Sequence, residues 1–164
     1  MNGVIGMTSL LLMTELTDAQ REYVNIIENS GESLMNIINE ILDFSKIETG
    51  RMELEESTFN LRLCIEDVLD LMAPRAQEKH LDIMYYIDPQ VHHYIYGDGF
   101  RLRQIIVNLV SNAIKFTEKG EIFIFVTLQQ NQMDEVILEF SVKDTGIGIP
   151  ADKIETLFSL DKAN

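Results

Sequence analysis

Two asparagines, Asn108 and Asn112, are spaced so that their side chains could bind one ligand together. They lie in an amphipathic pattern that predicts a helix beginning after Asp98 and ending near Phe116. Side chains four residues apart share one helix face, and asparagine is a poor helix former that usually needs a partner. Amide oxygens, with phosphate oxygens and water, suit Mg²⁺, and Lys115 is one turn further along. A plain solvated helix face is the alternative interpretation.

A second group of such residues follows a run of alternating apolar residues, in the sequence KDTGIGIP (143–150). The carboxylate of Asp144 can accept a hydrogen bond from an exocyclic amine. Gly146 and Gly148 leave room for a planar ring and for positive φ angles. A simple glycine turn is the alternative, because such short patterns are weak signals. Taken together, the two groups are harder to explain as a plain helix face and a simple turn than either group is alone.

The order of helices and strands expected around these groups predicts an α+β domain of two layers. Asn60 is placed to cap a helix, alternating apolar residues predict three strands, and a short helix is predicted after residue 150. The apolar positions are Leu61, Ile65, Val68, Leu69 and Met72 in the first helix, then Leu81–Ile87, Ile122–Leu128 and Val136–Val142 in the strands. In the asparagine helix, Ile105, Ile106, Leu109, Val110, Ala113 and Ile114 cluster on the face opposite the asparagines.

Residues 1–56 predict a hairpin of two helices, 1–12 and 18–48. Thr17 and Gln20 have the spacing of a capping box at the start of the second helix. Its apolar stripe has the spacing of a bundle seam, with Tyr23, Ile27, Ser30, Leu34, Ile37, Ile41 and Phe44 in sequence. Two helices cannot bury this stripe, so we expect a homodimer that completes a four-helix bundle. A monomeric hairpin packed on the second half is the alternative.

The composition of the 164-residue chain excludes several classes of protein. A formal charge of -14 argues against nucleic acid as a partner. The apolar stretch near Leu10–Met13 is far shorter than the ~20 residues of a membrane span, so we expect no membrane contact. The single cysteine, Cys64, excludes an internal disulfide and a cysteine-based zinc cluster, and is expected to be a small core residue. These features are consistent with a cytoplasmic protein.

Several stretches resemble the sensor histidine kinases of two-component systems. NLVSNAIKFT (108–117) resembles the N box of this family, DGFRLRQIIVNL (98–109) its lead-in, and DTGIGIP (144–150) the G1 box. LMNIINEILDFSKIETGRMELE (34–55) resembles the second helix of the dimerisation and histidine-phosphotransfer domain with its exit linker. MNGVIGM (1–7) resembles the stretch that follows the phospho-accepting histidine.

The resemblance implies a fold, a cofactor and a set of roles. Residues 1–56 would form half of a dimeric four-helix bundle, and residues 57–164 an incomplete two-layer α/β sandwich of the histidine kinase, gyrase and chaperone type. The cofactors would be ATP and Mg²⁺, and the protein partner a response-regulator receiver domain. The implied roles are Asn112 for Mg²⁺, Asn108 beside the phosphates and metal, Lys115 for phosphate, Asp144 for the adenine amine, Gly146 and Gly148 for the adenine pocket, and Phe116 for the lining of the nucleotide pocket.

The sequence also departs from the family pattern. The family's acceptor histidine lies in a short motif that would directly precede MNGVIGM. The three histidines of this chain, His80, His92 and His93, lie outside any such motif. Leu157 and Phe158 are a partial F box, Asp161 stands where a second aromatic is usual, and no second glycine-rich motif follows. The chain therefore resembles a kinase trimmed at both ends, without a catalytic histidine, with any membrane tether outside it. We expect weak nucleotide binding and no autophosphorylation.

Two other functions stay open from the sequence. A non-catalytic dimerisation or interaction module would need only the helical seam. An ATP hydrolase of the same fold would need a base to activate water, and relatives of that kind carry a glutamate at the position of Asn108. An amide is a poor base, so the sequence favours a kinase over a hydrolase.

Overall fold

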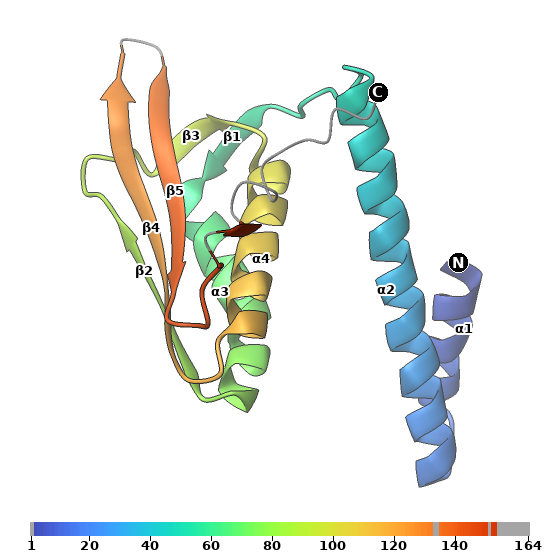
Figure 1. Ribbon diagram of the computed structural model, residues 1–164. Coiled ribbons are helices and arrows are strands. Elements are labelled where there is room, and N and C mark those ends of the chain that lie inside the picture. Colours follow the sequence, from blue (N-terminus) through green and yellow to red (C-terminus); the bar gives the residue numbers. More distant parts are fainter. Residues whose placement is uncertain (1, 133–134, 151, 154–164) are drawn as a thin grey trace. The chain divides into compact units, whose positions relative to one another are not determined.

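The chain forms two compact units, residues 1–53 and 54–164, and each is described by itself. The computed structural model, shown in Figure 1, describes residues 2–132, 135–150 and 152–153. The partial F box at Leu157, Phe158 and Asp161 lies outside these residues, as does most of the short helix predicted after residue 150. Within the described ranges, no helix combines the length and apolar character that a membrane crossing requires.

The first unit is a pair of helices, α1 (Asn2–Leu12) and α2 (Asp18–Glu48), which confirms the predicted hairpin. The predicted capping box is present at the start of α2. The backbone N–H of Gln20 donates to the hydroxyl of Thr17 at 3.3 Å, and the Thr17 N–H donates to the Gln20 side-chain oxygen at 3.0 Å. The helix ends at Thr49 and Gly50, where Gly50 adopts a φ of 62° that favours glycine.

Most of the apolar stripe on α2 is exposed in a single chain. Val24 is buried, and Gly31 lies against the side chain of Ile5, so α1 covers only a narrow part of α2. The exposed large apolar residues of α2 are Tyr23, Ile26, Ile27, Leu34, Ile37, Ile38, Ile41, Leu42, Phe44 and Ile47. A helix this apolar on its open face needs a further partner to bury it.

The second unit is an α+β sandwich, as predicted. Its elements in chain order are β1 (Ser57–Asn60), α3 (Leu61–Glu78), β2 (Leu81–Ile87), β3 (Tyr94–Gly97), α4 (Gly99–Phe116), β4 (Gly120–Asn131) and β5 (Val136–Asp144). The main sheet has the order β2-β4-β5, with β2 parallel to β4 and β5 antiparallel to β4. β1 and β3 pair separately as an antiparallel ribbon.

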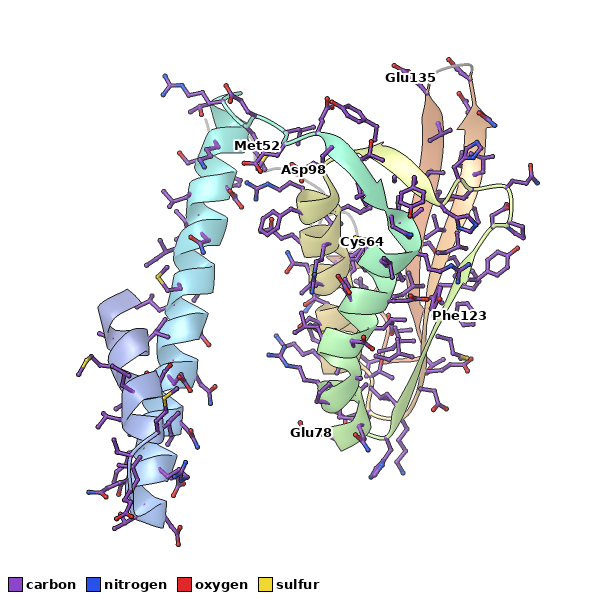
Figure 2. All side chains as sticks on the ribbon, turned by 180° about the vertical axis from the view of Figure 1, so that it is seen from behind. Met52, Cys64, Glu78, Asp98, Phe123 and Glu135 are labelled. Carbon is purple, nitrogen blue, oxygen red and sulfur yellow. The ribbon has the colours of Figure 1, made fainter. Side chains whose placement is uncertain are left out.

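One face of the main sheet is covered by α3 and α4 (Figure 1). Alternate residues of β4 point to this face, so Ile122, Ile124 and Val126 are fully buried. Phe123, labelled in Figure 2, belongs to the opposite set, and its ring stacks on Phe125 with centroids 4.3 Å apart. The helices contribute Leu61, Ile65, Val68, Met72, Ala76, Ile106, Val110, Ala113 and Ile114 to the core.

Two features of the second unit were not predicted. The strands β1 and β3 have four residues each, too few for alternation to distinguish them from a connector or loop. On α4, the residues Ile105 and Leu109 are 56% and 42% exposed, although they belong to the apolar face of the pattern. The sheet contacts a narrower stripe of α4 than the periodicity marks as apolar.

Side-chain caps fix where the two long helices of the sandwich begin. Asn60 accepts a hydrogen bond from the N–H of Leu63 at 3.1 Å, as its position predicted. Asp98, labelled in Figure 2 at the start of α4, accepts from the N–H of Arg101 at 2.9 Å. Its second oxygen accepts from the N–H of Glu55 at 3.0 Å. One carboxylate therefore caps α4 and ties the incoming chain to it.

Stability should depend on the ionisation of Asp98 in acid. The hydrogen bond from the Arg101 N–H lowers the pKa of Asp98 below its ordinary 3.8. A lowered pKa stabilises the folded state above the unfolded pKa, and this stabilisation is lost as pH falls through the folded pKa. Asp98→Asn keeps an acceptor at the cap and removes the titration. In urea denaturation, the free energy of unfolding of wild type should exceed that of the variant at about pH 6. The difference should shrink as the pH falls below 3.8. A gap independent of pH would contradict this.

Candidate functional site

The exposed face of α4 carries the polar residues singled out in the sequence. Asn108, Asn112 and Lys115 are all exposed, and the buried face of the same helix carries Val110 and Ile114. Phe116, the last residue of α4, is 47% exposed, and the Lys115 ammonium nitrogen lies 5.1 Å from its ring centroid. The amides, the cation and the aromatic ring thus follow one another along the last three turns of the helix.

The loop from Asp144 to Gly148, called here the 144–148 loop, is joined to the end of this helix. The Asp144 carboxylate accepts a hydrogen bond from the Gly146 N–H at 2.9 Å, which turns the chain as it leaves β5. The next N–H, that of Ile147, donates to the carbonyl oxygen of Phe116 at 3.3 Å. The loop after a strand and the last carbonyls of α4 therefore meet directly.

Gly146 is required by the closeness of this contact. A Cβ atom at position 146 would lie 2.4 Å from the Phe116 carbonyl oxygen and 2.8 Å from the Asp144 carboxylate. Glycine is favoured at position 148 for a different reason. Its φ of 67° lies in the left-handed region, whereas no atom lies within 4 Å of where a Cβ would be. One glycine supplies space and the other supplies backbone conformation.

The other side of the loop is fixed by Thr145. The Thr145 N–H donates to the Glu121 carbonyl at 3.2 Å, and the Glu121 N–H donates to the Thr145 hydroxyl at 3.0 Å. Gly120 has a φ of 120°, and a Cβ there would lie 2.1 Å from the Thr145 hydroxyl oxygen, too close to be accommodated. The sequence did not single out these residues for the site, because neither a glycine at the start of a strand nor a threonine after one predicts such a contact.

The structure brings Gly146 into contact with both Phe116 and Asp144. The two asparagines lie farther from this contact, along α4. Asn112 lies one helical turn before Phe116, and Asn108 lies two turns before it, or about 12 Å along the axis. Asp144 pairs with Ile122 of β4, whose side chain is buried on the face covered by the helices, and Asn112 belongs to α4, so the two residues lie on the same side of the sheet. A ligand spanning both groups would need a ring at one end and an extended anionic part at the other.

The donor set restricts how a metal ion could bind here. Among the described residues, no group of three or more His, Cys, Asp or Glu side chains could hold a metal ion. A magnesium ion at α4 would therefore take amide oxygens from the protein and most ligands from phosphate and water, as this ion often does. The exposed amides of Asn108 and Asn112 fit that coordination.

Two cavities elsewhere in the second unit lie apart from these residues. One of about 400 Å³ lies at the opposite end of α4 and includes Cys64, Asp98 and Arg103. The other, of about 540 Å³, lies between α3 and β2. Cys64 is half-buried, and burial raises the pKa of its thiol, which keeps it protonated and a poor nucleophile.

Two family models match this chain. Residues 1–50 match the His Kinase A (phospho-acceptor) domain. Residues 97–163 match the histidine kinase-, DNA gyrase B- and HSP90-like ATPase domain. The second match contains all seven candidate residues of α4 and the 144–148 loop.

Curated relatives align with nearly the whole chain. The chain is 45% identical over 158 residues to the sensor histidine kinase GacS of Pseudomonas protegens, covering 96% of this chain and 17% of that protein. It is 46% identical over 158 residues to the signal transduction histidine-protein kinase BarA of Escherichia coli, with the same coverage. Dictyostelium discoideum dokA, a hybrid signal transduction protein, is 43% identical over 96% of this chain and 10% of its own length. The chain therefore spans less than a fifth of these relatives.

Solved structures share the fold. The crystal structure of full-length ShkA in complex with AMPPNP superposes with a TM-score of 0.73 at 36% identity, covering 93% of this chain and 32% of that one. The histidine kinase ThkA in complex with the response regulator protein TrrA superposes with a TM-score of 0.57 at 28% identity, covering 95% and 45%.

Replacing Gly146 should break the contact between the loop and α4. We expect Gly146→Ala to lower the free energy of unfolding by about 2 kcal/mol, because the added methyl overlaps the Phe116 carbonyl oxygen. Gly148→Ala should cost about 1 kcal/mol, since only the backbone conformation is unfavourable. Urea denaturation gives both energies, and hydrogen exchange of the Ile147 amide reports the contact. Equal effects of the two variants, with Ile147 protection retained in both, would show that the close approach is not a constraint.

Proposed function

Because the chain belongs to the sensor histidine kinase family, we propose that α4 and the 144–148 loop bind Mg-ATP for phosphoryl transfer to a histidine and then to a response-regulator aspartate. The observation that carries this proposal is the hydrogen bond from the Ile147 N–H to the Phe116 carbonyl. It sets the acid-bearing loop against the end of the amide-bearing helix. The likeness to a kinase solved with a response regulator and to a structure holding AMPPNP supports it.

Each candidate residue has a role in this proposal. Asp144 accepts the adenine amine, and Gly146 and Gly148 shape the space for the ring. Phe116 lines the pocket beside the ring. The remaining residues act on the polar end of the nucleotide, with Asn112 ligating Mg²⁺, Asn108 beside the phosphates and the metal, and Lys115 contacting phosphate.

Positioning and charge neutralisation are what phosphoryl transfer mainly requires of a protein. ATP would supply the transferred phosphoryl group and Mg²⁺ would neutralise its oxygens. The amide of Asn108 cannot take a proton from water as a carboxylate can. This difference supports transfer to a protein side chain over hydrolysis.

We propose that none of the three histidines is a phosphoryl acceptor in this chain. His80 lies just after α3 with a φ of 54°, and His92 and His93 lie in the loop before β3. All three are exposed and none belongs to α1 or α2. Incubation with Mg²⁺ and γ-labelled ATP should leave the chain unlabelled. Base-stable and acid-labile label would identify phosphohistidine and overturn this assignment.

The helical unit is proposed to pair with a second copy and to offer its surface to a receiver domain. The exposed stripe of α2 and the match of residues 1–50 to the phospho-acceptor domain support this. We also propose a cytoplasmic location, because ATP and response regulators are found there. A non-catalytic dimerisation module remains the second candidate, favoured by the same stripe and distinguished by an absence of nucleotide binding.

Nucleotide binding is the central test. Calorimetry with ADP and Mg²⁺ should give a Kd on the order of 0.1–1 mM, or about -4 to -5.5 kcal/mol. Asp144→Ala should weaken binding at least tenfold by removing the amine's acceptor, which corresponds to about 1.4 kcal/mol. Asn112→Ala should make the Kd insensitive to Mg²⁺. Asp82→Ala is the matched control, because it removes an equal charge from the exposed start of β2. Absence of any binding by wild type would leave only the interaction module.

Dimerisation should depend on the exposed stripe. Sedimentation at micromolar concentration should show a dimer, and Ile41→Asp should weaken it by about 3 kcal/mol or more, since both copies lose a buried side chain worth ~1.5 kcal/mol. Asn39→Asp is the control, because it adds the same charge at an exposed position outside the stripe. A wild-type monomer, or equal weakening by both substitutions, would count against the bundle.

A further inference from the structure

The last carbonyls of α4 have an unusual set of partners. A helix leaves its final four carbonyl groups without intrahelical partners. In α4 the Ala113 carbonyl accepts from the Thr117 N–H at 3.0 Å, and the Phe116 carbonyl accepts from the Ile147 N–H at 3.3 Å. The two between them accept from one side chain, as the ammonium of Lys79 lies 2.9 Å from the Ile114 oxygen and 3.1 Å from the Lys115 oxygen.

Lys79 uses its full donor capacity at this helix end. Its third hydrogen bond goes to the carbonyl of Thr117 at 3.3 Å, and an ammonium group has three N–H donors. The carbonyl end of a helix carries partial negative charge, so a cation there is stabilising. Lys79 itself is the C-cap residue of α3, just before β2, and follows Glu78, the last residue of α3, which is labelled in Figure 2. The hydrogen bonds thus fasten the end of α4 to the junction of α3 and β2.

We infer that Lys79 is a positioning residue for the nucleotide site, an inference that rests on the function proposed above. By holding the carbonyls at 114, 115 and 117, Lys79 fixes the direction of the carbonyl between them, that of Phe116. The Phe116 carbonyl accepts the hydrogen bond from the 144–148 loop, so Lys79 influences the position of Asp144 through the end of α4. The same anchoring sets where the side chains of Lys115 and Phe116 leave the helix.

This geometry does not favour a direct role of Lys79 in binding phosphate. All three donors of Lys79 are directed at backbone oxygens, and moving the ammonium to a ligand would leave carbonyls without partners. Ile114 and Thr117 are 5% and 0% exposed, so water has little access to replace the hydrogen bonds to these two carbonyls. Lys79 therefore affects a ligand through the backbone that it holds.

Three substitutions separate positioning from other roles. Lys79→Met keeps the apolar stem and removes the donors and the charge. Lys79→Arg keeps both charge and donors. Lys119→Met is the matched control, because it removes a lysine charge from the exposed turn just beyond the same helix end. A residue that only stabilises the fold would lower the free energy of unfolding without changing the nucleotide affinity of the folded protein.

The experiment is an NMR titration of the full chain with ADP and Mg²⁺, at a temperature where circular dichroism shows each variant folded. Lys79→Met should raise the Kd about fivefold, and the ligand-free variant should exchange its Ile147 amide faster than wild type. Lys79→Arg and Lys119→Met should stay within about twofold of wild type. If Lys79→Met does not fold, Lys79→Gln, which keeps one donor group and loses the charge, takes its place with the same expectations.

The outcomes distinguish this inference from the proposed function. If wild type binds ADP and a folded Lys79→Met binds it equally well with unchanged Ile147 exchange, the positioning role is wrong and the nucleotide site stands. If Lys119→Met weakens binding as much as Lys79→Met, the effect is one of general charge and the positioning role is again wrong. If wild type binds no ADP, the proposed nucleotide site itself is wrong, and the inference built on it is overturned with it.

Discussion

The end of α4 is held by hydrogen bonds from three segments of the second unit. Its last four carbonyls are satisfied by Thr117, by Lys79 and by Ile147, which come from the helix itself, from the end of α3 and from the loop after β5. Buried carbonyls without partners are costly, so these three segments must adopt one mutual arrangement for the sandwich to fold. That arrangement sets the position of the exposed asparagines relative to the 144–148 loop.

Glycine makes this arrangement possible at two points. Gly146 lets the loop backbone approach the Phe116 carbonyl, and Gly120 lets Thr145 lie against the first residues of β4. The loop is thereby held from both sides, by α4 and by β4, while its carboxylate and the backbone after it stay exposed. A rigid support beneath an exposed polar loop is what a binding site needs, because less conformational freedom is then lost when a ligand binds.

In the helical unit, by contrast, the apolar stripe of α2 lies largely uncovered in a single chain. Capping and a regular apolar stripe determine α2, yet α1 buries little of that stripe. A helical hairpin with so many exposed isoleucine, leucine and aromatic side chains is stable only with another surface to cover them. The family membership of the chain supports a second copy as that surface.

Features that depend on near neighbours in the chain could be predicted from the sequence. Helix periodicity, the caps at Thr17 and Asn60, the start of a helix after Asp98, and alternation in β2, β4 and β5 are local properties, and the structure confirms them. The cap role of Asp98, the pairing of β1 with β3, the exposure of Ile105 and Leu109, and the partners of Lys79 and Thr145 became visible only in the folded structure. Lys79 and Ile114 are separated by 35 residues, and Glu121 and Thr145 by 24. Such contacts leave no periodic signal, because they exist only once packing has brought distant segments together.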